Sequence, residues 1–122
     1  MKVLRDENII QLTEKVYDLI ARTSIEIGHK TDGKTMASLA KIFASDLQKE
    51  TRFGLMTFNQ VQDAFHIGVR FGKDEPFLNI RTFYKWTYAH KQVVDHAEHQ
   101  VRVLKMDPEQ VAYYQEPIKL LK

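Results

Sequence analysis

Residues 53–91, FGLMTFNQVQDAFHIGVRFGKDEPFLNIRTFYKWTYAHK, decide the fold of this chain. They hold nine of its thirteen aromatic residues, and basic side chains lie among them. Aromatic rings can fill a core or stack on nucleic-acid bases, and cations can bind phosphate. The stretch is therefore compatible with a packed core and with a binding surface. The surrounding sequence has to indicate which of its residues belong to which.

Two helix starts lie within this stretch. Thr57 and Gln60 match the capping box, in which a side chain at each end of the first turn satisfies a free backbone amide. Asn79 is a good cap for a helix that we predict from Ile80 to about Lys105, with a bend near His90. Large apolar residues recur within both segments, which predicts that each helix buries one face.

We predict an ordered loop between these two helices, at residues 68–78. Gly68 is expected to end the first helix, because glycine readily adopts the left-handed conformation of a helix terminus. Phe71, Phe77 and Leu78 are expected to pin the loop to the core, since a loop in free solvent has little use for three large apolar side chains.

The remaining helices are predicted from apolar residues spaced three and four apart. One runs from about Glu7 to Ile27, with Asp6 as its cap and Gly28 as its terminator. A second covers about Lys34 to Thr51. Asp107 and Pro108 mark a short last helix that reaches about Gln115. With about five helices and no convincing alternating strand, the sequence predicts a compact all-α bundle.

Length and composition fit one domain spanning residues 1–122. The chain is 43% hydrophobic and 28% charged, which is ordinary for a globular domain. It has no cysteine, so disulfides, thiolate metal sites and cysteine nucleophiles are excluded. No apolar run approaches the roughly 18 residues that cross a bilayer, and the start MKVLRDEN becomes charged too early for a secretory signal. We therefore expect a cytoplasmic protein with no membrane partner.

Positive charge is concentrated in one part of the chain. The net charge is only +2, which is too small to indicate nucleic-acid binding by itself. However, residues 67–91 contain five basic and two acidic residues, so the rest of the chain is slightly acidic. The candidate nucleic-acid contacts come from this segment: Arg70, Lys73, Arg81, Tyr84, Lys85 and Lys91. Phe65, Phe83 and Trp86 are assigned to the core instead.

Residues 28–35 match the phosphate-binding pattern G-x-x-x-x-G-K-[ST]. In a true phosphate-binding loop, Lys34 would reach the outer phosphates and Thr35 would hold a metal ion. That motif requires a buried strand before Gly28, whereas the preceding residues have a helical pattern with a charged face. We therefore favour a polar loop between helices, although the nucleotide-binding interpretation stays open.

A second group of residues has metal-binding chemistry. It consists of His90, Asp95, His96, Glu98 and His99. Pairs spaced three or four apart share a helix face, but three of these side chains cannot all converge without a ligand from elsewhere. A solvated helix face of mixed charge is the favoured interpretation. No Ser/His/Asp arrangement or paired acid cluster is present, so we expect no enzyme active site, no metal and no cofactor.

Two motifs follow each other in the central segment. They consist of Ala64, Phe65, Gly68, Val69 and Arg70, and then Asn79, Ile80, Thr82, Phe83, Tyr84 and Trp86. This pattern resembles a group of small proteins from phages and mobile elements of Bacteroides-type bacteria. Members pair a helix ending Ala-Phe-x-x-Gly-Val-Arg with a helix beginning Asn-Val-x-Thr-Phe-Tyr-x-Trp, and Ile80 stands here in place of the valine. The resemblance covers about a third of the chain. It implies a mobile-element origin and a role near DNA replication, and it supplies no catalytic residues.

Two functions follow as expectations. The first is a non-enzymatic phage or mobile-element accessory protein in the host cytoplasm that binds nucleic acid or joins a replication complex. The alternative is a protein-binding adaptor, or an inhibitor of a host enzyme or defence system, with exposed aromatics near Phe71 and Phe77, or Tyr113 and Tyr114, as anchors.

Overall fold

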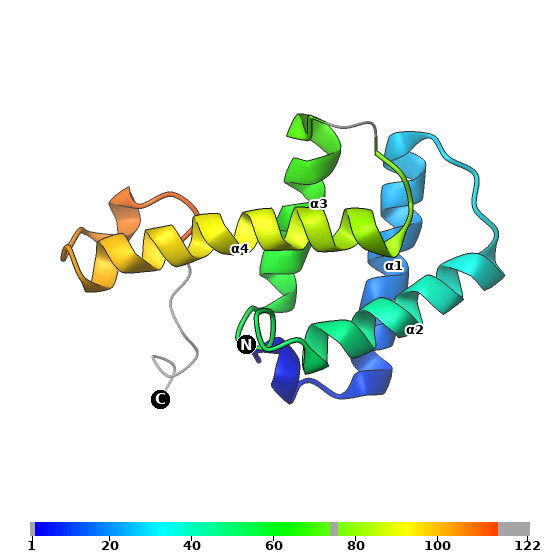
Figure 1. The fold of residues 1–122 in the computed structure, drawn as a ribbon, viewed down its shortest axis with the longest axis horizontal. Helices are drawn as coiled ribbons and strands as arrows, with labels where there is room; N and C mark the ends of the chain where they lie inside the picture. Colours follow the sequence, from blue (N-terminus) through cyan, green and yellow to red (C-terminus); the bar gives the residue numbers. More distant parts are fainter. Residues whose placement is uncertain (1, 74–75, 115–122) are drawn as a thin grey trace.

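A computed structural model describes residues 2–73 and 76–114, which are folded into helices and short connections (Figure 1). The elements are η1 (Leu4–Asp6), α1 (Ile9–Ile27), α2 (Gly33–Lys49), α3 (Phe58–Phe71), α4 (Ile80–Arg102) and η2 (Pro108–Gln110), where η marks a 3-10 turn. Among the described residues there is no strand, only an isolated bridge between Val3 and Thr57. The all-α prediction is confirmed, whereas the number of α-helices in this part of the chain is four and not five.

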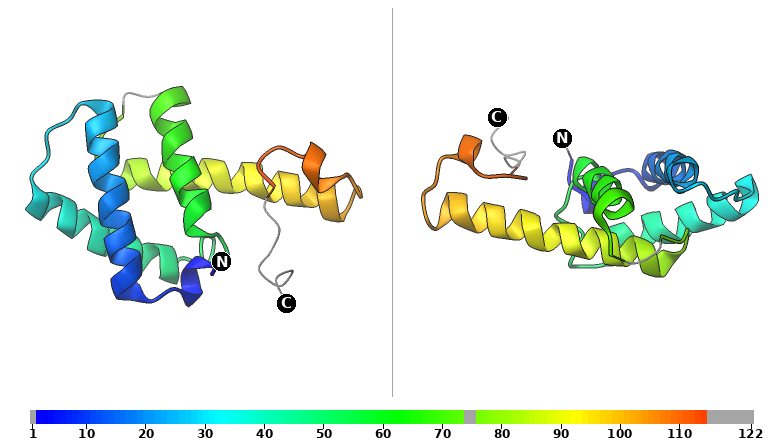
Figure 2. Two further views of the ribbon diagram at one scale, coloured as in Figure 1. Left: turned by 180° about the vertical axis from the view of Figure 1, so that it is seen from behind. Right: turned by 90° about the horizontal axis from the view of Figure 1, so that it is seen from above.

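The four helices form two hairpins that pack against each other. α1 packs mainly on α2, and α3 packs mainly on α4. α1 and α3 run side by side, and α4 crosses them on one side of the molecule (Figures 1 and 2). The C-terminal half of α4 extends past the other helices (Figure 1). One long face of α4 therefore lies on the outside of the molecule.

Three phenylalanine rings from three helices meet in the core. Phe43 of α2 lies with its ring centroid 5.9 Å from that of Phe65 in α3 and 5.3 Å from that of Phe83 in α4. The rings of Phe65 and Phe83 are 5.1 Å apart. All three side chains are buried, and α1 adds Leu12, Val16 and Ile20 beneath them. Tilted ring pairs of this kind contribute about 0.5–1.5 kcal/mol each beyond the burial of their area.

Gly68 is a contact residue inside α3, which corrects its predicted role as a helix terminator. α3 continues for another turn, to Phe71. A Cβ atom on Gly68 would lie only 2.3 Å from the Trp86 ring, so the indole packs directly on the α3 backbone. The Trp86 ring also meets that of Phe65 edge-on at 5.3 Å. Glycine is thus required at position 68 because α3 and α4 approach closely there.

The predicted loop at 68–78 is also shorter than expected. Its described residues start at Gly72, after the last turn of α3. Leu78 packs against the core as predicted. Phe71 and Phe77 do not, because their side chains are 76% and 52% exposed. These two rings therefore belong to the surface, and of the three predicted anchors Leu78 alone packs against the core.

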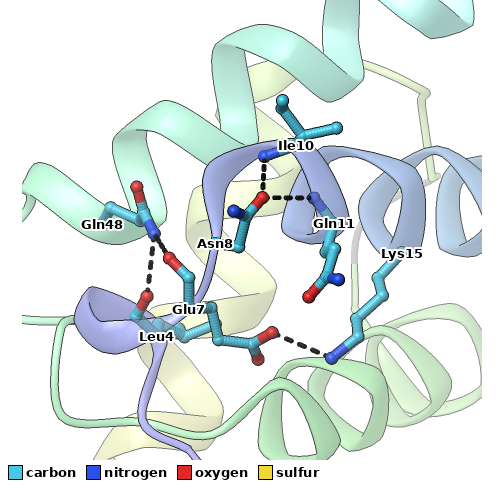
Figure 3. Close-up of polar contacts among 7 residues, drawn as sticks. All are labelled: Leu4, Glu7, Asn8, Ile10, Gln11, Lys15 and Gln48. Carbon is cyan, nitrogen blue, oxygen red and sulfur yellow. Dashed lines mark hydrogen bonds and ion pairs between the residues drawn. The ribbon is translucent and has the colours of Figure 1, made fainter.

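The N-terminal residues are clasped by Gln48 of α2 (Figure 3) and by the turn that precedes α3, where the amides of Leu4 and Arg5 donate to the carbonyl oxygens of Met56 and Gly54. The Gln48 side-chain amide donates to the carbonyl oxygens of Leu4 and Glu7, and the Glu7 carboxylate pairs with Lys15 at 2.8 Å. Asn8 caps α1, since its side-chain oxygen accepts from the amides of Ile10 and Gln11. The predicted cap, Asp6, lies instead at the end of η1.

The C-terminal part of the described chain also differs from its prediction. α4 runs without interruption through His90 to Arg102, so the expected bend is absent. Asp107 does cap a turn, but that turn is only η2 and not a last α-helix, and Gln115 lies outside the described residues. Residues 103–114, which we name the C-terminal strap, fold back along α4 and bury Val111 (Figure 2). No helix in the described ranges combines the length and apolar character needed to cross a membrane.

Gly68→Ala tests the close contact between α3 and α4. On an open helix this change would stabilise the protein by about 0.5–1 kcal/mol. Here the added methyl group would collide with Trp86, and we expect the free energy of unfolding to fall by about 1–3 kcal/mol. Urea denaturation measures the change.

Gly33→Ala is the matched control, because its Cβ would meet nothing closer than the Tyr17 hydroxyl at 3.4 Å. A Gly68→Ala variant as stable as the parent protein would show that the contact is not as close as described.

Candidate nucleic-acid interface on α4

Tyr84, one of the predicted contact residues, is turned toward the core. Its ring centroid lies 6.0 Å from that of Phe43 and 5.5 Å from that of Phe53. Burial, helped by a hydrogen bond to Asp46, raises the pKa of Tyr84 to about 12. Tyr84 is therefore partly buried against the core and lies off the face that carries Arg81 and Lys85.

Arg70 and Lys91 are engaged in ion pairs. The Arg70 guanidinium donates to both carboxylate oxygens of Glu26, at 3.0 and 3.3 Å, and so ties α3 to the end of α1. This contact is the main reason that the pKa of Glu26 lies below its usual value. Lys91 pairs with Asp95, one turn along α4. Both cations therefore have a carboxylate partner within the protein.

Arg81 and Lys85 lie on the exposed side of α4, opposite its buried residues. The buried positions are Phe83, Thr87, His90, Val94 and Ala97. Exposed residues continue the line of Arg81 and Lys85 at spacings of three and four, which is the repeat of one helix face. We define the outward face of α4 as Arg81, Lys85, Tyr88, Gln92, His96 and His99. Of the six predicted contact residues, only Arg81 and Lys85 belong to it, while Lys73 is exposed on the connection after α3.

The carboxylates near the outward face are each paired with a basic side chain. Asp95 borders this face and is held by Lys91, and Glu98 pairs with Arg102 at 2.8 Å. These two are the only carboxylates in α4, all of which the structure describes. The outward face, which Asp95 borders, is consequently a surface of cations and hydrogen-bonding groups, and the α4 carboxylates beside it are paired with basic side chains.

Arg52 extends this surface from the turn after α2. Its guanidinium lies 5.4 Å from the centre of the Tyr88 ring and pairs with Glu50 at 3.0 Å. The hydrogen bond from Arg52 lowers the pKa of Glu50. Sequence reasoning missed Arg52 and did not assign Tyr88 to the interface. The position of Tyr88, seven residues after Arg81, is the signal that could have found it.

The other side of α4 borders an apolar groove of about 300 Å³ between α3 and α4. Its walls include Ile67, Phe71, Trp86, Val93 and Tyr113. Phe71 and Tyr113 are more than half exposed, and Val93 is 41% exposed. Lys73 lies at its edge. The predicted aromatic anchors Phe71 and Tyr113 therefore meet in one groove, whereas Phe77 lies against His29 of the loop before α2.

His90 forms part of the wall of this groove and is itself only 4% exposed. Its ring meets that of Tyr113 edge-on, with centroids 5.3 Å apart, so it joins α4 to the C-terminal strap. Burial lowers the pKa of His90, and the nearby charge of Asp63 opposes that shift. The imidazole is therefore held neutral where the strap covers it.

The motif at residues 28–35 does not have the geometry of a phosphate-binding loop. It follows a helix, α1, and not a strand, and Gly28 closes that helix with a φ of 74°. The Asp32 carboxylate accepts a hydrogen bond from the Thr35 amide at 2.7 Å. An acidic side chain thus occupies the start of α2, where a phosphate would have to bind. This agrees with the favoured interpretation, a polar loop between helices.

The histidine-rich part of α4 does not converge on a metal site. His90 is buried, while His96 and His99 lie on the outward face. Across the described ranges, no three His, Asp or Glu side chains gather closely enough to hold a metal ion.

Comparisons of the chain with protein-family models, with curated proteins and with solved structures find no match.

The buried state of His90 predicts a pH dependence of stability. Because its pKa is lower in the folded protein than the usual value of about 6.5, the unfolded chain binds the proton more readily below that pH. Stability should be constant at higher pH and fall as the pH drops from about 6.5 toward the folded pKa. In His90→Gln this loss should be smaller.

The measurement is the free energy of unfolding by urea at several values between about pH 7 and pH 5, above the range in which Glu26, Asp32 and Glu50 titrate. His96→Gln, on the outward face, is the control and should keep the parent slope. Equal slopes in both variants and the parent would contradict the role given to His90.

Proposed function

We propose that this protein is a non-enzymatic accessory protein that binds nucleic acid through the outward face of α4. One observation supports the proposal above all. This face carries Arg81, Lys85 and a line of hydrogen-bonding side chains, while the two carboxylates of α4 are paired with basic side chains. Phosphate contacts from Arg and Lys provide affinity, and polar side chains between them can reach base edges.

The chemistry of the individual side chains fits this role. Arg81 and Lys85 lie in the first two turns of α4, where the positive end of the helix dipole also favours an anion. The Tyr88 hydroxyl, the Gln92 amide and the imidazoles of His96 and His99 can each donate or accept a hydrogen bond. The outward face therefore offers charge at one end and directional polar groups along the rest of its length.

The setting of this activity is part of the same proposal. The residues that resemble small phage and mobile-element proteins include the contact pair Gly68 and Trp86 and the cap Asn79, which together position α4. We propose a role beside DNA replication of such an element, in the cytoplasm of its host. An accessory protein of this kind needs an exposed binding helix and no catalytic residues.

Removing the two cations tests the proposal. The double variant Arg81→Gln, Lys85→Gln should bind nucleic acid more weakly, and the slope of log affinity against log salt should flatten by about two units, because each lost phosphate contact removes roughly one. Fluorescence anisotropy with labelled oligonucleotides measures both quantities.

Arg70→Gln is the matched control. It removes the same charge from a cation that lies on α3, away from the outward face, so its effect on the salt slope should be small. The absence of binding by the parent protein at low salt would contradict the proposal, as would a double variant indistinguishable from Arg70→Gln.

A second function, protein binding, is favoured by the apolar groove between α3 and α4. Phe71 projects there with 76% of its side chain exposed. Large exposed apolar groups around a groove mark protein interaction sites more often than isolated surface residues do. The fitting partner is an amphipathic helix that inserts apolar side chains beside Phe71 and Tyr113.

Phe71→Ser tests this alternative. A partner held by the groove should co-purify after nuclease treatment, should be lost from Phe71→Ser, and should be retained by the Arg81→Gln, Lys85→Gln variant. Phe77→Ser is the control, because Phe77 is also exposed but packs against His29 and not in the groove. A partner that Phe71→Ser retains would argue against the groove.

A further inference from the structure

We infer that the ligand of the outward face is B-form duplex DNA, and that α4 binds in the major groove of the duplex. This inference rests on the proposed function and names its substrate class. It depends on the shape of α4, on the spacing of the polar side chains along it and on the single aromatic residue that it exposes.

The shape of α4 suits a groove that admits a whole helix. α4 is continuous over 23 residues, a length of about 35 Å, and its C-terminal half extends beyond the other helices (Figure 1). The C-terminal strap folds onto the side that carries His90, so it leaves the outward face uncovered. The major groove of B-form DNA is about 12 Å wide and accepts an α-helix. The major groove of A-form RNA is too deep and narrow for this.

The outward residues form one line of polar side chains along α4. Neighbours in this line are three or four residues apart, so they rise by about 4.5–6 Å along the helix. A helix that lies in the major groove can direct such a line toward the base edges. Gln92 lies at the middle of the face, and glutamine can form paired hydrogen bonds with the edge of adenine in the major groove. Arg81 and Lys85 then lie toward one end, where the backbone phosphates border the groove.

The aromatic content of the face disfavours a single strand as the ligand. Proteins that bind single strands stack successive bases on several aromatic rings. On the outward face Tyr88 is the single aromatic residue, and Arg52 already lies over its ring. The other rings of α4 are used elsewhere: Phe83 and Tyr84 in the core, and Trp86 on Gly68. Stacking on α4 is therefore limited to one position.

Binding to three nucleic acids of the same sequence tests the inference. The probes are a DNA duplex of about two helical turns, one of its single strands, and the corresponding RNA duplex, each at about 50 mM salt. We expect the DNA duplex to bind at least tenfold more tightly than the other two. Methyl green, which occupies the major groove, should displace the protein, and netropsin, which occupies the minor groove, should not.

A charge change at Gln92 tests whether this residue contacts the duplex. Gln92→Glu places a carboxylate at the middle of the outward face and should weaken duplex binding at least tenfold, whereas Gln11→Glu on α1 should leave it unchanged. The two variants have the same net charge, and both positions are exposed on helices. Folding is checked by circular dichroism.

The outcomes separate this inference from the proposed function. Equal or tighter binding of the single strand or the RNA duplex would overturn the assignment to duplex DNA but would leave nucleic-acid binding intact. Displacement by netropsin alone would overturn the major-groove assignment in the same way. If none of the three probes binds at low salt, both the inference and the proposed function fail.

Discussion

The close approach of α3 and α4 at Gly68 and Trp86 is the constraint on which the rest of the structure depends. Because position 68 has no side chain, the indole of Trp86 packs on the α3 backbone and brings Phe83 into contact with Phe65 and Phe43. That contact fixes the rotation of α4 about its own axis. Once the rotation is set, Phe83, His90 and Val94 must face inward, and the residues opposite them must face solvent. The outward face is thus a consequence of how the core is packed.

The same contact divides the aromatic and basic residues of the central segment into three groups. One group, with Phe65, Phe83 and Tyr84, belongs to the core. A second group, with Phe71 and Trp86, lines the apolar groove. The third, with Arg81, Lys85 and Tyr88, forms the outward face. A helix of this kind presents an apolar surface on one side and a polar surface on the other.

Local signals in the sequence predicted much of the fold. The capping box at Thr57 and Gln60 and the cap at Asn79 appear as expected, because cap chemistry depends on residues within one turn of each other. The core positions of Phe65 and Phe83 follow from helical spacing. Asp6 was predicted as the cap in place of Asn8 because both residues have a short side-chain acceptor, and the 3-10 turn that contains Asp6 could not be read from the sequence. Gly68 was misassigned because glycine at a helix end and glycine at a helix contact look alike in a sequence.

The composition of the candidate site was harder to predict, because it depends on residues distant in the chain. Arg70 pairs with Glu26, which lies 44 positions away, and nothing in the local sequence indicates that pair. Tyr84 is covered by Phe53 and bonded to Asp46 only because α2 ends beside α4. Arg52 reaches Tyr88 for the same reason. Spacing along one helix could place Arg81 and Lys85 on a common face, but only the packing of the other helices shows which face remains exposed.

The most direct test of the central claim, that the outward face of α4 is the functional surface, is an NMR titration of the folded protein with duplex DNA. The account predicts that the resonances that shift most belong to Arg81, Lys85, Tyr88 and Gln92, while those of buried Phe83 and of Phe71 and Tyr113 in the groove change little. Shifts centred on Phe71, Val93 and Tyr113 with α4's outward face unchanged would contradict it.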